Sequence, residues 1–137
     1  MSTTFRCSLY RSLAIAPIAA LLVGPASALA ADVSKEVSTA AEHAGYAADA
    51  TLLTTAQAHL HHTVNCLVGP KGKGFDAKEL NPCKGIGNGA IPDSTDAAKK
   101  KLLEQALKSA DAGLATKDLA AAKKAAAEAK ATLKSAM

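Results

Sequence analysis

Residues 48–70 read ADATLLTTAQAHLHHTVNCLVGP, and the conformation of the first four of them decides between two folds. The residues that follow are apolar at steps of three and four, as on one face of an α-helix. These positions are Leu53, Ala56, Leu60, Thr63 and Leu67. A turn at 48–51 predicts a separate helix before this one, whereas the absence of a turn predicts one helix over 32–67.

The same spacing recurs in three further segments of the chain. Before the quoted stretch the apolar positions are Val33, Val37, Ala40, Ala44 and Ala47. After residue 92 they are Leu103, Leu107, Ala110 and Leu114, followed by Leu119, Ala122, Ala126, Ala129 and Leu133. Narrow apolar seams of this kind pack helices at small crossing angles, so we expect an all-α fold.

Residues 68–92 form a loop between the two helical halves. Nine glycines and prolines fall in this range and interrupt any regular helix. Asp93 or Ser94 is the expected N-cap of the helix that follows. Gly113 is expected to break the C-terminal segment, with Thr116 as the N-cap of the last helix.

A shift of 66 residues aligns the two halves loosely and places Leu53 on Leu119. If this is an internal repeat, the turn at 48–51 exists and the chain is a four-helix bundle of two antiparallel hairpins. If it is not, one long helix over 32–67 packs against a helical hairpin. In both alternatives the glycine-rich loop lies in the centre of the chain.

Residues 1–30 have the layout of a signal peptide. Two arginines precede an apolar run over 13–23, and Ala28-Leu29-Ala30 ends a stretch of small residues suited to cleavage. The apolar run is too short to span a membrane, and no later segment is apolar enough. We therefore expect cleavage after residue 30, a periplasmic or secreted location, and a single helical domain over 31–137.

Cleavage would remove Cys7 and leave Cys66 and Cys83. Two cysteines in an exported protein are expected to pair. The bridge would close the glycine-rich loop and contribute about 3 kcal/mol by the chain-entropy estimate. The alternative is that a Cys66 thiolate binds a metal ion, which excludes the disulfide.

The charge and the aromatic content argue against a nucleic-acid interface. The formal net charge is +4, and the loss of Arg6 and Arg11 reduces it to about +2. No arginine then remains to form hydrogen bonds with phosphate groups. Tyr46 and Phe75 are the aromatic residues left to stack on bases. No histidine sits in a context that would activate a nucleophile, so we expect no enzymatic function.

Histidine is the residue type that carries chemistry here. On a helix His59, His62 and Cys66 lie on one stripe beside the apolar seam, while His61 points away from it. Such a stripe can place two imidazoles on one metal ion, and imidazole suits copper, nickel and zinc alike. His43 joins them only if the chain turns near residue 50, since on one continuous helix it faces the side nearly opposite His59.

Haem is not expected as a cofactor. The chain has no C-x-x-C-H motif for covalent attachment. A non-covalent haem would need bulky apolar walls, which this composition lacks. A competing function is a structural or partner-docking protein without a metal, which would use the loop over 68–92 and its lysines Lys71, Lys73 and Lys84.

Three alanine-rich helical segments share a similar spacing of residues: Ala41-Glu42-His43-Ala44, residues 56–62, and residues 103–129 with Ala112-Gly113. This pattern resembles that of small periplasmic metal-binding proteins of bacteria. These are histidine-containing four-helix bundles that bind copper and other divalent metals. The resemblance implies the bundle fold and metal binding, with His43 and His62 as the best-matching positions. Our leading hypothesis is an exported protein that sequesters or delivers copper, nickel or zinc through helix histidines.

Overall fold

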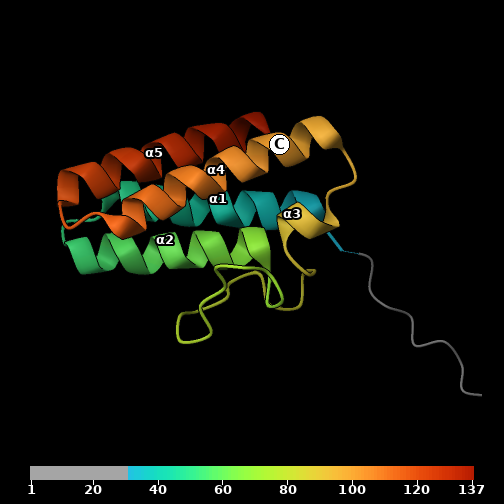
Figure 1. Ribbon diagram of the computed structural model, residues 1–137, viewed down its shortest axis with the longest axis horizontal. Helices are drawn as coiled ribbons and strands as arrows, with labels where there is room; N and C mark the ends of the chain where they lie inside the picture. The colour runs from blue at the N-terminus through green and yellow to red at the C-terminus, as the bar shows by residue number, and fades with distance from the viewer. Residues whose placement is uncertain (1–30) are drawn as a thin grey trace, which may run out of the picture.

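The computed structural model describes residues 31–137, so the predicted signal peptide lies outside the described residues (Figure 1). The described residues contain five helices and no strand, which confirms the all-α prediction. The helices are α1 (Val33–Asp49), α2 (Leu53–Val68), α3 (Ala90–Asp93), α4 (Ala97–Ala115) and α5 (Leu119–Ser135). None of them combines the length and the hydropathy that crossing a bilayer would require.

The four long helices lie side by side, and each runs opposite to the one before it (Figure 1). α1 packs against α2 and α5, and α4 packs against α5 and α2. The α1–α2 hairpin therefore faces the α4–α5 hairpin. The short α3 lies at the end where α1 begins and α2 ends, in contact with α1, α2 and α4.

The chain turns directly after Asp49, so the alternative of one long helix over 32–67 is wrong. Ala50 leaves the helix with an extended backbone. The turn contains no glycine or proline. Instead Ala50 packs with Ala56 of α2 and Ala122 of α5 in a small buried cluster. Tertiary packing, rather than a helix-breaking residue, ends the first helix.

The predicted apolar seams form most of the core. Val33, Leu53 and Leu119, each at the start of its helix, are only partly buried, and α4 departs further from its predicted seam. Leu107 and Leu114 are only half-buried. The fully buried positions of α4 are Leu103, Ala106, Ala110 and Gly113. Small residues on this face let neighbouring helices approach closely but bury little apolar area per residue.

The predicted break at Gly113 is wrong, because α4 continues through this residue to Ala115. A Cβ atom at Gly113 would lie 2.6 Å from Leu60 Cδ1 and 3.2 Å from Ala125 Cβ. Separations this short are closer than ordinary van der Waals contact. The glycine therefore serves the packing of α4 against α2 and α5 and does not end the helix.

Both predicted N-caps are also corrected. Asp93 ends α3 and Ser94 follows it, whereas α4 begins after Asp96, whose carboxylate accepts a first-turn backbone N–H at 2.8 Å. α5 begins after Asp118, which accepts one at 2.7 Å, while Thr116 follows the end of α4. A carboxylate at the N-cap both accepts this bond and complements the positive end of the helix dipole.

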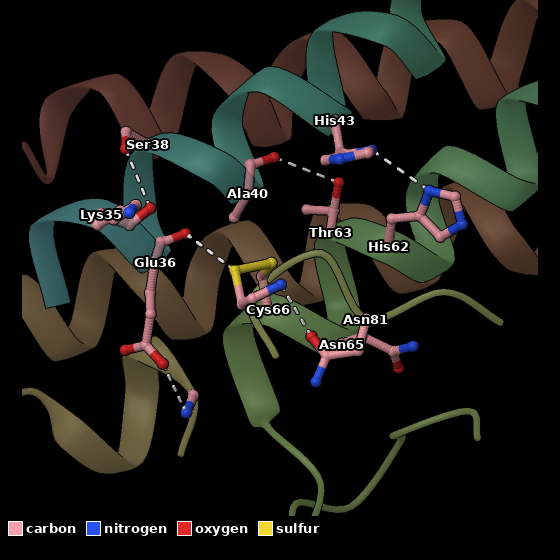
Figure 2. Close-up of a disulfide and its surroundings, with 12 residues drawn as sticks. Lys35, Glu36, Ser38, Ala40, His43, His62, Thr63, Asn65, Cys66 and Asn81 are labelled. Atoms are coloured by element: carbon pink, nitrogen blue, oxygen red, sulfur yellow. Dashed lines mark hydrogen bonds between the residues drawn. A yellow bond between two sulfur atoms is a disulfide. The ribbon is translucent and has the colours of Figure 1, made fainter. Parts of the chain in front are cut away.

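Cys66 and Cys83 form the predicted disulfide, which closes the loop after α2. The neighbouring Asn65 side chain, which is fully buried, holds the same loop. Figure 2 shows Asn65 beside the disulfide. Its amide donates to the carbonyl oxygens of Asp76 at 2.9 Å and Leu80 at 3.1 Å. Its oxygen accepts the N–H of Asp76 at 2.9 Å. The loop is thus attached to α2 at two adjacent positions.

Glu36 of α1 attaches the far end of the loop. Its side chain is fully buried, and one oxygen accepts the N–H of Gly89 at 2.9 Å. The other oxygen has no hydrogen-bond partner among the described residues. Burial raises the pKa of this carboxyl, and the nearby Asp93 and Asp32 raise it further against the lowering effect of the Gly89 bond.

Candidate metal centre

His43 of α1 meets His59 and His62 of α2 on one side of the α1–α2 hairpin. His43 Nδ1 lies 3.2 Å from His59 Nδ1 and 3.3 Å from His62 Nδ1. Figure 2 shows His43 and His62 pointing toward one another from the two helices. One ligand atom from each of the three side chains lies within 4.8 Å of the others. Within residues 31–137 no other group of histidine, cysteine or acidic side chains is placed in this way.

The hairpin brings these side chains together. His59 and His62 are three residues apart, so they share one face of α2. The turn after Asp49 lays α1 antiparallel to α2 and places His43 opposite them. Thr63 supports this register, because its hydroxyl contacts the carbonyl oxygen of Ala40 at 3.3 Å (Figure 2) and that of His59 at 3.0 Å.

The two distances measured from His43 Nδ1 match the ligand spacing around a tetrahedral metal ion. Zinc lies about 2.0 to 2.1 Å from imidazole nitrogen, so two ligands on a tetrahedron are about 3.3 to 3.4 Å apart. The two contacts of His43 Nδ1, at 3.2 and 3.3 Å, are close to this value. An ion could therefore lie beside His43 at ligand distance, and each of the three side chains offers a ligand atom within 4.8 Å of the others.

The three nitrogens cannot satisfy one another by hydrogen bonding alone. A neutral imidazole nitrogen carries either one N–H or one lone pair in the ring plane. His43 Nδ1 faces both His59 and His62 through that single site. At most one of the two contacts can therefore be a well-directed hydrogen bond. A metal ion would instead accept a lone pair from each ring.

Burial favours the metal-binding form of two histidines of the group, His43 and His62. It lowers the pKa of His43 and His62 below the ordinary value of 6.5, and the neighbouring imidazoles lower it further. The neutral ring is the ligand form of histidine. At neutral pH the lone pairs are therefore available without the release of a proton from an imidazolium.

Two side chains that sequence reasoning missed line the site. The ring of Tyr46 lies 5.5 Å from that of His43 and 5.3 Å from that of His59, measured between centroids. Its hydroxyl donates to Glu42, which raises the pKa of Tyr46. The position of Tyr46, three residues after His43, was an available signal. Glu79 comes from the loop, and its carboxylate lies 3.8 Å from His62 Nε2. No sequence pattern predicts that a residue of this loop lies beside the histidines.

The site excludes two other residues of α2, Cys66 from the predicted stripe and His61, which was predicted to point away from that stripe. Cys66 is buried in the disulfide and has no thiolate to offer, so the alternative of a Cys66 ligand is wrong. His61 is outside the group, as its predicted orientation required. Its Nδ1 is buried and lies 3.9 Å from the carboxylate of Asp76.

Comparison of the chain with protein-family models, with curated proteins and with solved structures finds no match. The resemblance to periplasmic metal-binding proteins therefore stays a prediction. What the structure itself provides is a group of three histidines whose nitrogens are close enough to hold one ion.

The stability of the metal-free protein is expected to fall as the pH drops below about 6.5, because protons then bind the unfolded chain more readily than the folded one. The folded-state pKa of His43 and of His62 is lowered, so the stability that these residues contribute is present above the ordinary pKa. It is lost as the pH falls toward the lowered values. Urea unfolding between roughly pH 8 and pH 5 measures this dependence.

The double variant His43→Ala/His62→Ala is the control for this titration, since other titrating groups such as Glu36 are common to both proteins. The difference in the free energy of unfolding between the two proteins should shrink in acid. A difference that stays constant over this range would contradict the pKa shifts.

Proposed function

We propose that this chain is an exported four-helix-bundle protein that binds one divalent transition-metal ion through His43, His59 and His62. The candidate ions are copper, nickel and zinc, for which imidazole is a suitable ligand. The proposed role is sequestration or delivery of the ion in the periplasm or outside the cell, and not catalysis. The observation that carries the proposal is the meeting of three histidine side chains from two helices, with His43 Nδ1 close to Nδ1 of both His59 and His62.

The number of ligands supports delivery over a purely structural role. Structural zinc sites are closed by four protein ligands, whereas three ligands leave a coordination position open. The histidine group supplies three. An open position lets a ligand from a recipient bind the ion before the first protein releases it.

Isothermal titration of the purified protein with Cu(II), Ni(II) and Zn(II) tests the proposal. We expect one ion per chain for at least one metal, with a dissociation constant below about 1 μM, or roughly 8 kcal/mol of binding free energy. The control is His61→Ala, which removes an imidazole of the same helix outside the group. Absence of sub-micromolar binding of all three metals would disprove the proposed function.

A groove beside the loop favours the second candidate function, which is docking of a partner without a metal. The groove has a volume of about 610 Å³ and an apolar wall that includes Val68, Ile91 and Pro92. Lys71 and Lys100 also line it. If no metal binds, this surface becomes the leading candidate, and Ile91→Asp would then be the variant to compare with the native protein in cross-linking experiments.

A further inference from the structure

His62 presents its two ring nitrogens to different partners. Nδ1 faces His43 at 3.3 Å, inside the proposed metal site. Nε2 faces the other way and lies 3.8 Å from a carboxylate oxygen of Glu79. The His62 side chain is 12% exposed and that of Glu79 is 36% exposed, so the pair is only partly screened by water.

Glu79 is held in this place by α2 itself. Asn65 lies three residues after His62, on the same side of the helix. Its side chain makes three hydrogen bonds to the backbone of Asp76 and Leu80, which flank Glu79 in the loop. The Glu79 N–H also donates to the carbonyl oxygen of Asp76 at 3.3 Å. One helix thus carries both the imidazole and the anchor of the carboxylate that faces it.

We propose that Glu79 is a positioning residue of the metal site, which rests on the metal-binding function proposed above. Its carboxylate attracts the N–H of His62 to Nε2 and so leaves the lone pair on Nδ1, directed toward His43. At 3.8 Å the contact is electrostatic or bridged by water rather than a direct hydrogen bond. Metal-bound histidines commonly present their second N–H to a carboxylate, which sets the tautomer and the ring orientation.

This arrangement assigns a function to the loop that the disulfide closes. The loop crosses α2 next to the histidines and supplies the one carboxylate that contacts His62 among the described residues. Cys66–Cys83 and Asn65 prevent the segment from moving away. Glu79 therefore stabilises the ligand tautomer without being a ligand.

Metal affinity of Glu79→Ala and Glu79→Gln tests the proposal, with Glu104→Ala, an exposed glutamate of α4, as the matched control. We expect Glu79→Ala to weaken binding by about 10- to 100-fold, the range typical of an outer-shell partner. Glu79→Gln should weaken it less, because its amide oxygen still attracts the N–H. Glu104→Ala should bind like the native protein.

A second readout does not need the metal. Nitrogen-15 NMR of the metal-free protein reports which ring nitrogen of His62 carries the proton. We expect the Nε2–H tautomer in the native protein and a mixture of tautomers in Glu79→Ala. A loss of fold would move all signals, whereas this change concerns one ring.

The outcomes separate this proposal from the proposed function. If the native protein binds metal and Glu79→Ala binds it equally well with an unchanged His62 tautomer, the role of Glu79 is disproved and the metal site stands. If the native protein binds no metal, the proposed function fails, and the role of Glu79 at the metal site fails with it, even if the tautomer changes. Asn65→Ala should weaken binding as Glu79→Ala does, and adding Glu79→Ala to it should cause little further loss.

Discussion

His43→Ala is expected to weaken metal binding by at least about 100-fold, beyond the 10- to 100-fold typical of an outer-shell residue. His43 is the proposed ligand from α1, and its Nδ1 contacts the nitrogens of both His59 and His62. Without it the site has two imidazoles at a spacing of three residues on a single helix. Two such nitrogens leave half of a tetrahedral coordination sphere to water.

Competition with a chelator of known affinity measures this loss for whichever ion the native protein prefers. His61→Ala is the matched control, since His61 neighbours His62 but lies outside the group. It should retain the affinity of the native protein. An unchanged affinity in His43→Ala would show that the ion binds to α2 alone and that the turn after Asp49 plays no part in the site.

Removal of the disulfide is expected to be the largest single loss of stability. The bond joins cysteines 17 residues apart, and closing a loop of this length stabilises a protein by about 3 kcal/mol. For a domain of this size Cys66→Ala/Cys83→Ala should melt roughly 10 to 20 °C below the native protein. The effect matters here because the alanine-rich core offers little apolar area to compensate.

Thermal unfolding with and without a dithiol reductant provides the control. The reductant should lower the melting temperature of the native protein toward that of the double variant and leave the variant unchanged. A double variant that melts within about 3 °C of the native protein would mean that the bond contributes less than roughly 1 kcal/mol, against the estimate.

Most of the fold follows from the spacing of apolar residues. The seams predicted for α1, α2 and α5 are buried except at the first residue of each, which is partly buried. In α4 Leu103 and Ala110 occupy their predicted places. The shift of 66 residues also proved informative: Asp49 and Ala115 both end helices, and Leu53 and Leu119 both begin them. The turn after Asp49 could be predicted from this comparison, although no residue in the turn itself favours one.

Only part of the candidate metal site could be predicted from the sequence. The spacing of His59 and His62 placed them on one face, and His43 was conditional on the turn. The direction of each Nδ1 atom depends on ring orientations set by neighbouring side chains, which spacing does not specify. The roles of Asn65 and Glu79 could not be predicted from the sequence, because they depend on a loop that folds back over α2.

The sequence by itself determined most of the helical faces and the loop, since these depend on local periodicity and on glycine and proline. The pairing of Cys66 with Cys83 was predicted from the two cysteines that lie outside the predicted signal peptide. The tertiary structure decided where α1 ends, that Gly113 is a packing residue, and that three imidazoles converge. These features depend on contacts between segments far apart in the chain. Their physical cause is the close approach of small residues across helices, which fixes the register and so brings His43 to His62.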